Sequence, residues 1–247
     1  MKVCIIIPAR YGSKRYKGKP LVKILGREMV LRVADICSKV VKKENLYIAT
    51  DSKKISEKVI KNGYNSIITS KKCLTGTDRV AEASKKINSD IYINVQGDEP
   101  TIKPNDIRKI IKSKIKFSNH VICGFDKVQK LDRPSSLNLP KIVLNENNEL
   151  VYISRSVIPG SKKKMQKKDY LKQVCIYGFN KEELKKFYSR KKKSKLEKIE
   201  DIEILRFFEY NIKIKMVKLQ SNSIAVDEKA DVKKAEELLK KRHQMYK

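Results

Sequence analysis

The sequence contains few of the residues on which several common kinds of site depend. There is no tryptophan, and there are only two histidines in 247 residues, so a histidine-based metal centre or nucleophile is not expected. The five cysteines are widely spread and form no Cys-x-x-Cys pair, which argues against a zinc site and a disulfide framework. They are typical of small buried apolar residues in a reducing compartment, and we expect a cytoplasmic protein.

Long apolar runs are also missing. No segment approaches the roughly 20 apolar residues that span a bilayer, which predicts no membrane insertion. Residues 1–4 lead directly into a short strand-like run, so no signal peptide is expected. With 40% apolar residues, a chain of this length has enough for one sizeable core and a smaller appendage.

Acidic residues are few beside basic ones. The 58 lysines and arginines against 28 acidic residues give a net charge of +30, which by itself suits a nucleic-acid-binding protein. The lysines are spread along every predicted helix, however, and the dense runs at 161–164 and 190–193 lack interleaved aromatics. We therefore expect a lysine-solvated surface and no nucleic-acid partner, with a basic field that attracts anionic substrates.

A cation-rich loop follows the first predicted strand. The apolar run ends at Pro8, and a glycine-bearing loop follows at the carboxyl end of that strand, where open α/β sheets bind ligands. Loop amides backed by cationic side chains predict a polyphosphate site, although neither GxxxxGK[ST] nor GxGxxG is present. The candidate nucleotide-binding residues of this loop are Pro8, Ala9, Arg10, Ser13, Arg15 and Lys19.

Two adjacent carboxylates follow an alternating strand at 91–95. The segment Gln-Gly-Asp-Glu-Pro at 96–100 is poorly explained by packing, and carboxylates at such a strand end commonly hold Mg²⁺ together with substrate phosphates. Because adjacent strand residues point to opposite faces, we expect only one of the two carboxylates to be the main metal ligand, and we choose Asp98 over Glu99. The alternative is a solvated acidic turn.

Two further segments have both a structural and a functional interpretation. Gly76 and Arg79 lie at a predicted helix start, whose amides suit an anion or a base edge, but ordinary capping and a structural ion pair explain them equally well. Asp227 ends an apolar strand-like run at 224–226 and precedes an amphipathic helix, which it would cap.

Helical and strand patterns alternate along the chain. They predict an α/β fold with a mixed, mainly parallel sheet. We expect a single domain over 1–247, with a nucleotide-binding half at 1–125, a smaller subdomain at about 126–215, and a return to the core at 216–247. A hairpin is expected at 141–153 and a helix at 200–209.

Four segments resemble the bacterial 3-deoxy-manno-octulosonate (Kdo) cytidylyltransferase family, the CMP-Kdo synthetases. They are PARYGSKR with GKPL, NVQGDEP, SRSVIP and AVDEKAD, and the likeness runs from residue 5 to 239 in the family's order. The resemblance implies a nucleotidyltransferase-type Rossmann-like sheet with an inserted sugar-binding and dimerisation subdomain. It also implies CMP transfer from CTP to the anomeric hydroxyl of an acidic sugar, release of pyrophosphate, a Mg²⁺ cofactor, a homodimer, and a place in lipopolysaccharide or surface-polysaccharide synthesis.

The resemblance also assigns roles to residues. Mg²⁺ is assigned to Asp98 and Asp227, which with Arg10 and Lys19 form the catalytic set, and the nucleotide to Gly76, Arg79 and Gln96 besides the first loop. The sugar-binding residues it implies are Gln96, Arg155, Gln173, Tyr177 and Glu203.

The sequence departs from the family pattern at Gln173, Phe179 and Ile204, where the family has histidine, tyrosine and glutamine. The departures leave open a different acidic sugar, either a Kdo variant or a nonulosonic acid. A sugar-1-phosphate nucleotidylyltransferase is disfavoured because its LAxGxGxR opening is absent.

Overall fold

The computed structural model of the chain describes residues 1–12, 16–129, 132–163 and 165–244. The main strands are β1 (Val3–Ala9), β4 (Leu46–Thr50), β5 (Asn65–Ile68), β6 (Ile91–Val95), β7 (Val121–Lys127), β8 (Lys141–Leu144), β9 (Leu150–Ser154), β10 (Leu171–Phe179) and β11 (Ile214–Lys218). The helices are α1 (Met29–Cys37), α2 (Lys53–Lys61), α3 (Gly76–Ser84), α4 (Pro104–Lys116), α5 (Lys181–Ser189), α6 (Lys195–Glu200), α7 (Leu205–Phe208) and α8 (Lys229–Gln244). A small ribbon of β2 (Lys23–Ile24) and β3 (Arg27–Glu28) precedes α1.

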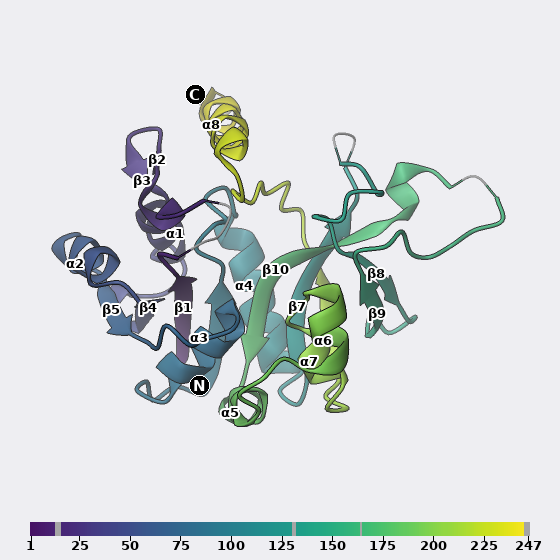
Figure 1. The fold of residues 1–247 in the computed structure, drawn as a ribbon, viewed down its shortest axis with the longest axis horizontal. Coiled ribbons are helices and arrows are strands. Elements are labelled where there is room, and N and C mark those ends of the chain that lie inside the picture. The colour runs from purple at the N-terminus through teal and green to yellow at the C-terminus, as the bar shows by residue number, and fades with distance from the viewer. Residues whose placement is uncertain (13–15, 130–131, 164, 245–247) are drawn as a thin grey trace.

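In this described part of the chain, nine strands form one sheet with the central order β11-β7-β10-β6-β1-β4-β5. The pairs β1–β4, β1–β6, β4–β5 and β7–β11 are parallel, and β10 is antiparallel to both β6 and β7. The mixed, mainly parallel sheet predicted from the sequence is confirmed. The β8–β9 hairpin extends from β10, on the side of the molecule away from β5 (Figure 1).

Helices cover both faces of the sheet, which explains why the central strands β1 and β6 are buried along almost their whole length. In β1, Cys4 and Ile6 join a cluster with residues of α3, α5 and α7. Ile5 and Ile7 join the opposite cluster, with residues of α1, α2 and α4. This two-sided burial fixes the sheet and holds the carboxyl ends of β1, β4 and β6 at one edge.

Two predicted elements are wrong. Residues 200–209 form no single helix, because Asp201 takes a left-handed conformation (φ 51°) that ends α6 before α7 begins. Residues 224–226 form no strand; they belong to an extended connection, and the N–H of Val226 donates to the Asp98 carbonyl over 2.9 Å.

The range 126–215 contributes to two parts of the fold, since it includes the β8–β9 hairpin and also β10 in the middle of the sheet. Within the described ranges, no helix is both long enough and apolar enough to cross a membrane.

Candidate active site

The ammonium of Lys19 lies between two carboxylates that are far apart in the sequence. Its Nζ donates to Asp98 Oδ2 over 2.7 Å and to Asp227 Oδ1 over 3.1 Å. Lys19 begins the short helix η1 (Lys19–Leu21) after the first loop, Asp98 follows β6, and Asp227 precedes α8. The fold thus brings both predicted aspartates within reach of a single cation.

Close backbone approach makes this meeting possible. A Cβ atom at residue 97 would lie 2.8 Å from the Pro8 carbonyl oxygen, so glycine is required for the turn after β6 to lie against the end of β1. Pro8 and Ala9 are buried there, and Arg10 is the first exposed residue of the loop. The predicted residues Ser13 and Arg15 lie outside the described residues.

The charges at this point are strongly coupled. Burial disfavours the ammonium of Lys19, but the attraction of Asp98 and Asp227 outweighs burial and raises the pKa of Lys19. Lys19 is therefore a cation at neutral pH, and it offsets the two carboxylates that surround it.

The same pair of carboxylates suits a hard divalent cation. No group of three or more histidine, cysteine or acidic side chains in the described ranges forms a metal site by itself. Mg²⁺ is commonly held by one or two carboxylates, with substrate phosphates and water completing its shell. Because Asp98 and Asp227 already share one cation, these donors fit Mg²⁺ bound together with a nucleotide.

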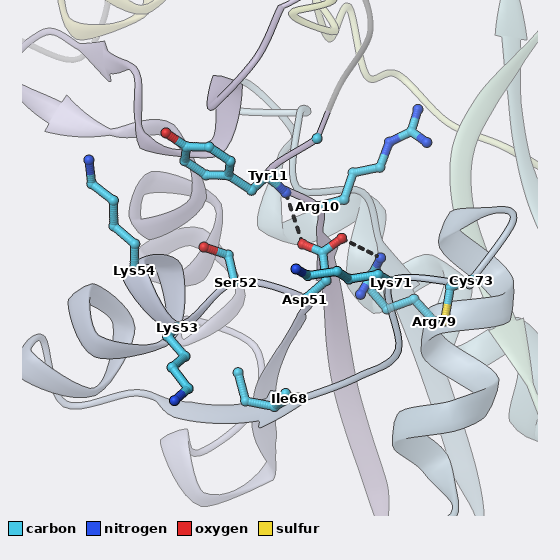
Figure 2. A pocket seen from close by; sticks show the side chains of 11 residues that line it. Arg10, Tyr11, Asp51, Ser52, Lys53, Lys54, Ile68, Lys71, Cys73 and Arg79 are labelled. Atoms are coloured by element: carbon cyan, nitrogen blue, oxygen red, sulfur yellow. Dashed lines mark hydrogen bonds and ion pairs between the residues drawn. The ribbon is translucent and has the colours of Figure 1, made fainter.

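A pocket of about 780 Å³ lies beside the first loop, between the ends of β1 and β4 and the start of α3 (Figure 2). It is lined by Arg10, Tyr11, Gly12, Asp51, Ser52, Lys53, Lys54, Ile68, Lys71, Cys73 and Arg79. The basic side chains outnumber the single carboxylate, so the pocket suits an anionic ligand.

Asp51 organises the floor of this pocket. Figure 2 shows its carboxylate between the N–H of Tyr11, which donates over 3.0 Å, and the guanidinium of Arg79, at 3.2 Å. Arg79 also donates to Thr69 Oγ1 over 2.5 Å and is only 3% exposed. Arg79 therefore has the structural ion pair that the sequence left as one of two interpretations, and it also lines the pocket.

A second cluster joins the start of α3 to the loop before α7. The N–H of Thr77 donates to Glu203 Oε2 over 3.0 Å, and Gln96 Nε2 donates to Glu203 Oε1 over 3.2 Å. A Cβ atom at residue 76 would lie 3.0 Å from the Gln96 amide, so a larger residue there would require the Gln96 side chain to shift. Burial raises the pKa of Glu203. Three predicted contact residues, Gly76, Gln96 and Glu203, are thus brought together.

Gln173 and Tyr177 form a buried polar pair on β10. Gln173 Nε2 donates to the Tyr177 hydroxyl over 3.3 Å. Burial first, and then the fields of groups that include Glu203, raises the pKa of Tyr177 well above its ordinary value, so its hydroxyl is neutral. The electrostatic influence of Glu203 links this pair to the cluster at Gln96.

Arg155 is engaged with the main chain. Its Nε, NH1 and NH2 donate to the carbonyls of Glu200 (2.6 Å), Leu137 (2.6 Å) and Asp201 (2.9 Å). In this arrangement the guanidinium fastens the end of β9 to the end of α6. Its contact with a sugar carboxylate stays a prediction.

Sequence reasoning missed several residues that the structure places at the site. Asp51 directly follows β4, but a strand end followed by a helix cap explains it equally well, so the pattern does not single it out. Lys71 and Cys73 come from a loop that carries no motif. Sequence reasoning weighs Glu99 only as the alternative to Asp98, and its contact with Ser223, across 124 residues, gives no signal in a single sequence.

Comparison with known proteins gives matches along almost the whole chain. A cytidylyltransferase family model matches residues 4–214. A 3-deoxy-manno-octulosonate cytidylyltransferase of Flavobacterium johnsoniae is 31% identical over 243 residues, 97% of this chain and 99% of that protein. An 8-amino-3,8-dideoxy-manno-octulosonate cytidylyltransferase of Shewanella baltica is 34% identical over 248 residues, with coverage of 97% and 99%.

The fold gives a corresponding match. A solved structure of a CMP:2-keto-3-deoxy-manno-octonic acid synthetase complexed with CTP is similar with a TM-score of 0.89 and 32% sequence identity. The similarity covers 98% of this chain and 100% of that chain.

Proposed function

Since this chain belongs to the 3-deoxy-manno-octulosonate cytidylyltransferase family, we propose that it transfers CMP from CTP to the anomeric hydroxyl of an acidic sugar, namely Kdo. The hydroxyl oxygen bonds to the α-phosphorus of CTP, the bond from that phosphorus to the β-phosphate oxygen breaks, and pyrophosphate leaves. The hydroxyl proton passes to solvent, and no residue is assigned as a base.

The observation that carries this proposal is the convergence of Lys19, Asp98 and Asp227 at one point. In-line phosphoryl-type transfer depends on positioning and charge neutralisation. Asp98 and Asp227 would hold Mg²⁺, which when bound supplies positive charge to phosphate oxygens and favours ionisation of an attacking hydroxyl. Lys19, Arg10 and Arg15 offset charge on the triphosphate, and Ser13 of the same loop orients it.

The remaining residues position the two substrates. The pocket around Asp51 and Arg79 takes part of the nucleotide, because it is basic and adjoins the first loop. The cluster of Gln96 and Glu203, with Tyr177 and Gln173, offers hydrogen-bonding groups to sugar hydroxyls. Arg155 binds the sugar carboxylate, for which the forked guanidinium is suited.

A pyrophosphate-release assay with CTP and a panel of acidic sugars tests the proposal. We expect Mg²⁺-dependent release with Kdo and little release when UTP or ATP replaces CTP. Turnover with Kdo no better than with sialic-type acids would contradict the choice of sugar. Absence of release with every sugar would contradict CMP transfer itself.

A second candidate substrate is 8-amino-3,8-dideoxy-manno-octulosonate. The Shewanella baltica protein is 34% identical to this chain and the Flavobacterium johnsoniae protein 31%, so the identities do not favour Kdo over the amino sugar. Gln173 also departs from the family pattern in the predicted sugar site. Inclusion of this amino sugar in the panel separates the two by their values of kcat/KM.

We also propose that the enzyme is a cytoplasmic homodimer that serves lipopolysaccharide or surface-polysaccharide synthesis. The family resemblance supports this assembly and setting. Light scattering should then give a mass of about twice the 28.6 kDa of the chain. A monomeric mass at micromolar concentration would contradict the dimer.

A further inference from the structure

The segment that carries Asp227 has no regular structure of its own. Residues 219–228 connect β11 to α8 without forming a helix or a strand. Local folding therefore does not fix the position of the Asp227 carboxylate, and contacts with other parts of the chain must do so.

Most of these contacts are made with the turn that follows β6, where Asp98 lies. Ser223 Oγ donates to Glu99 Oε2 and lies 3.1 Å from Thr101 Oγ1. The N–H of Ile224 donates to Thr101 Oγ1 over 2.8 Å. The N–H of Val226 donates to the Asp98 carbonyl. The two segments are thus joined side by side over four residues.

Arg242 of α8 reinforces the same connection. Its guanidinium donates to the Thr101 carbonyl over 2.5 Å and to the Ser221 carbonyl over 3.0 Å. One arginine therefore holds both segments from the side of α8.

Glu99 is the unusual member of this network. It is only 7% exposed, and a carboxylate is costly to bury unless its hydrogen bonds and charge are used. Its carboxylate is directed to a serine hydroxyl 124 residues away, while the neighbouring Asp98 contacts Lys19. The two adjacent acidic residues thus have separate roles. Asp98 belongs to the cation site, and Glu99 binds the segment that carries Asp227.

We propose that Glu99 is a positioning residue that acts through Ser223 to hold Asp227 beside Asp98, so that both carboxylates share one divalent cation. The inference rests on the proposed function, in which that cation is bound with CTP. Groups that orient metal ligands typically affect metal affinity by about 10- to 100-fold, and Glu99 and Ser223 orient Asp227 through the main chain of residues 223–226. Loss of the Ser223 hydroxyl should therefore weaken cation binding much more than it weakens the fold.

The chain provides a matched control. Ser221 is a nearby serine of the same segment, and its buried hydroxyl has no hydrogen-bond partner among the residues that the structure describes. Ser223→Ala removes the linking hydroxyl, and Ser221→Ala removes an equally small group without a link. Glu99→Gln keeps an acceptor for Ser223, whereas Glu99→Leu removes it.

The experiment measures Mn²⁺ binding to the enzyme–CTP complex without sugar, by electron paramagnetic resonance, with a titration of CTP alone subtracted. We expect Ser223→Ala and Glu99→Leu to raise the Kd for Mn²⁺ about 10-fold or more. Glu99→Gln should stay within about threefold, and Ser221→Ala should match the wild type. Thermal unfolding of each variant separates this effect from a general loss of stability.

Three results would overturn the inference. The first is a wild-type Mn²⁺ affinity in the Ser223→Ala variant. The second is a full loss in Glu99→Gln with none in Ser223→Ala, which would make Glu99 itself a ligand. The third is no Mn²⁺ binding by the wild type beyond that of CTP alone, which would refute the proposed metal site and not the positioning role alone.

Discussion

Arg206 and Asp78, 128 residues apart, form a buried ion pair in which NH1 lies 2.7 Å from Oδ1. Arg206 also donates from Nε to Glu197 over 2.6 Å, and it is fully buried against the ring of Phe187. Asp78 in turn completes the capping box of α3 by accepting from the N–H of Thr75, and Thr77 contacts Glu203 at the same helix N-terminus. Arg206 thus fixes the segment that carries Glu203 to the start of α3.

Replacement of Arg206 by methionine should destabilise the fold strongly. It would leave the carboxylates of Asp78 and Glu197 buried without their cation, which typically costs about 3–5 kcal/mol of unfolding free energy. Urea denaturation gives this difference. Arg108→Met removes an exposed arginine of α4 and should cost less than about 1 kcal/mol. Equal losses in the two variants would contradict the importance of the buried network.

Replacement of Lys19 by methionine should abolish most activity without unfolding the protein. The raised pKa of Lys19 keeps it charged, and removal of one preorganised charge at a reacting phosphate typically costs about 100- to 1000-fold in rate. The measurement is kcat/KM for CTP. Lys23→Met, at an exposed position of β2, should keep its rate within about twofold. Less than a tenfold loss in Lys19→Met would refute the assigned role.

Glu99 should make the stability of the metal-free protein depend on pH. Burial raises the pKa of Glu99 from its ordinary 4.5 to about 7, so the folded state binds the proton more tightly than the unfolded chain does. Its stabilising contribution is therefore present below about pH 4.5 and is lost as the pH rises towards 7, a change of about 3 kcal/mol.

The amide in Glu99→Gln does not titrate, so this variant should not lose stability as the pH rises. Its unfolding free energy relative to wild type should increase by about 2.5 kcal/mol between pH 5 and pH 8 in EDTA, as measured by urea denaturation. The exposed Glu57→Gln on α2 should show no such trend. A constant difference between Glu99→Gln and wild type at the two pH values would be inconsistent with a buried titrating Glu99.

Replacement of Gln173 by histidine should alter sugar recognition alone. The Gln173 amide donates to the Tyr177 hydroxyl, and loss of one such hydrogen bond costs about 1 kcal/mol. The KM for the sugar should therefore rise about fivefold. The KM for CTP should stay within about twofold, because the residues assigned to the triphosphate are not touched. A change in the KM for CTP as large as that for the sugar would place Gln173 outside the sugar site.

The family and the sheet were predictable from the sequence because their signals are local. Apolar runs, helix caps and the motifs around Arg10 and Asp98 each occupy a few consecutive residues, and both predictions are confirmed. The convergence of Asp98 and Asp227 followed from placing both at carboxyl ends of strands. The geometry agrees, but Asp227 follows an extended connection rather than a strand.

The rest depended on contacts between distant parts of the chain. The pairing of Glu99 with Ser223 and that of Arg206 with Asp78 join residues more than 120 positions apart, which no periodicity reveals. Two of the carbonyls that Arg155 contacts, those of Glu200 and Asp201, become available because α6 ends there. The Mg²⁺ cofactor and the individual roles of the site residues stay predictions.

Anomalous diffraction from crystals of the enzyme with CTP and Mn²⁺ tests the shared-cation site most directly. We predict a Mn²⁺ peak at coordination distance, about 2.1 Å, from carboxylate oxygens of both Asp98 and Asp227 and from a phosphate oxygen, with the Lys19 ammonium moved onto the phosphates. A peak that contacts neither aspartate, or a Lys19 ammonium that still bridges them with the nucleotide bound, would contradict it.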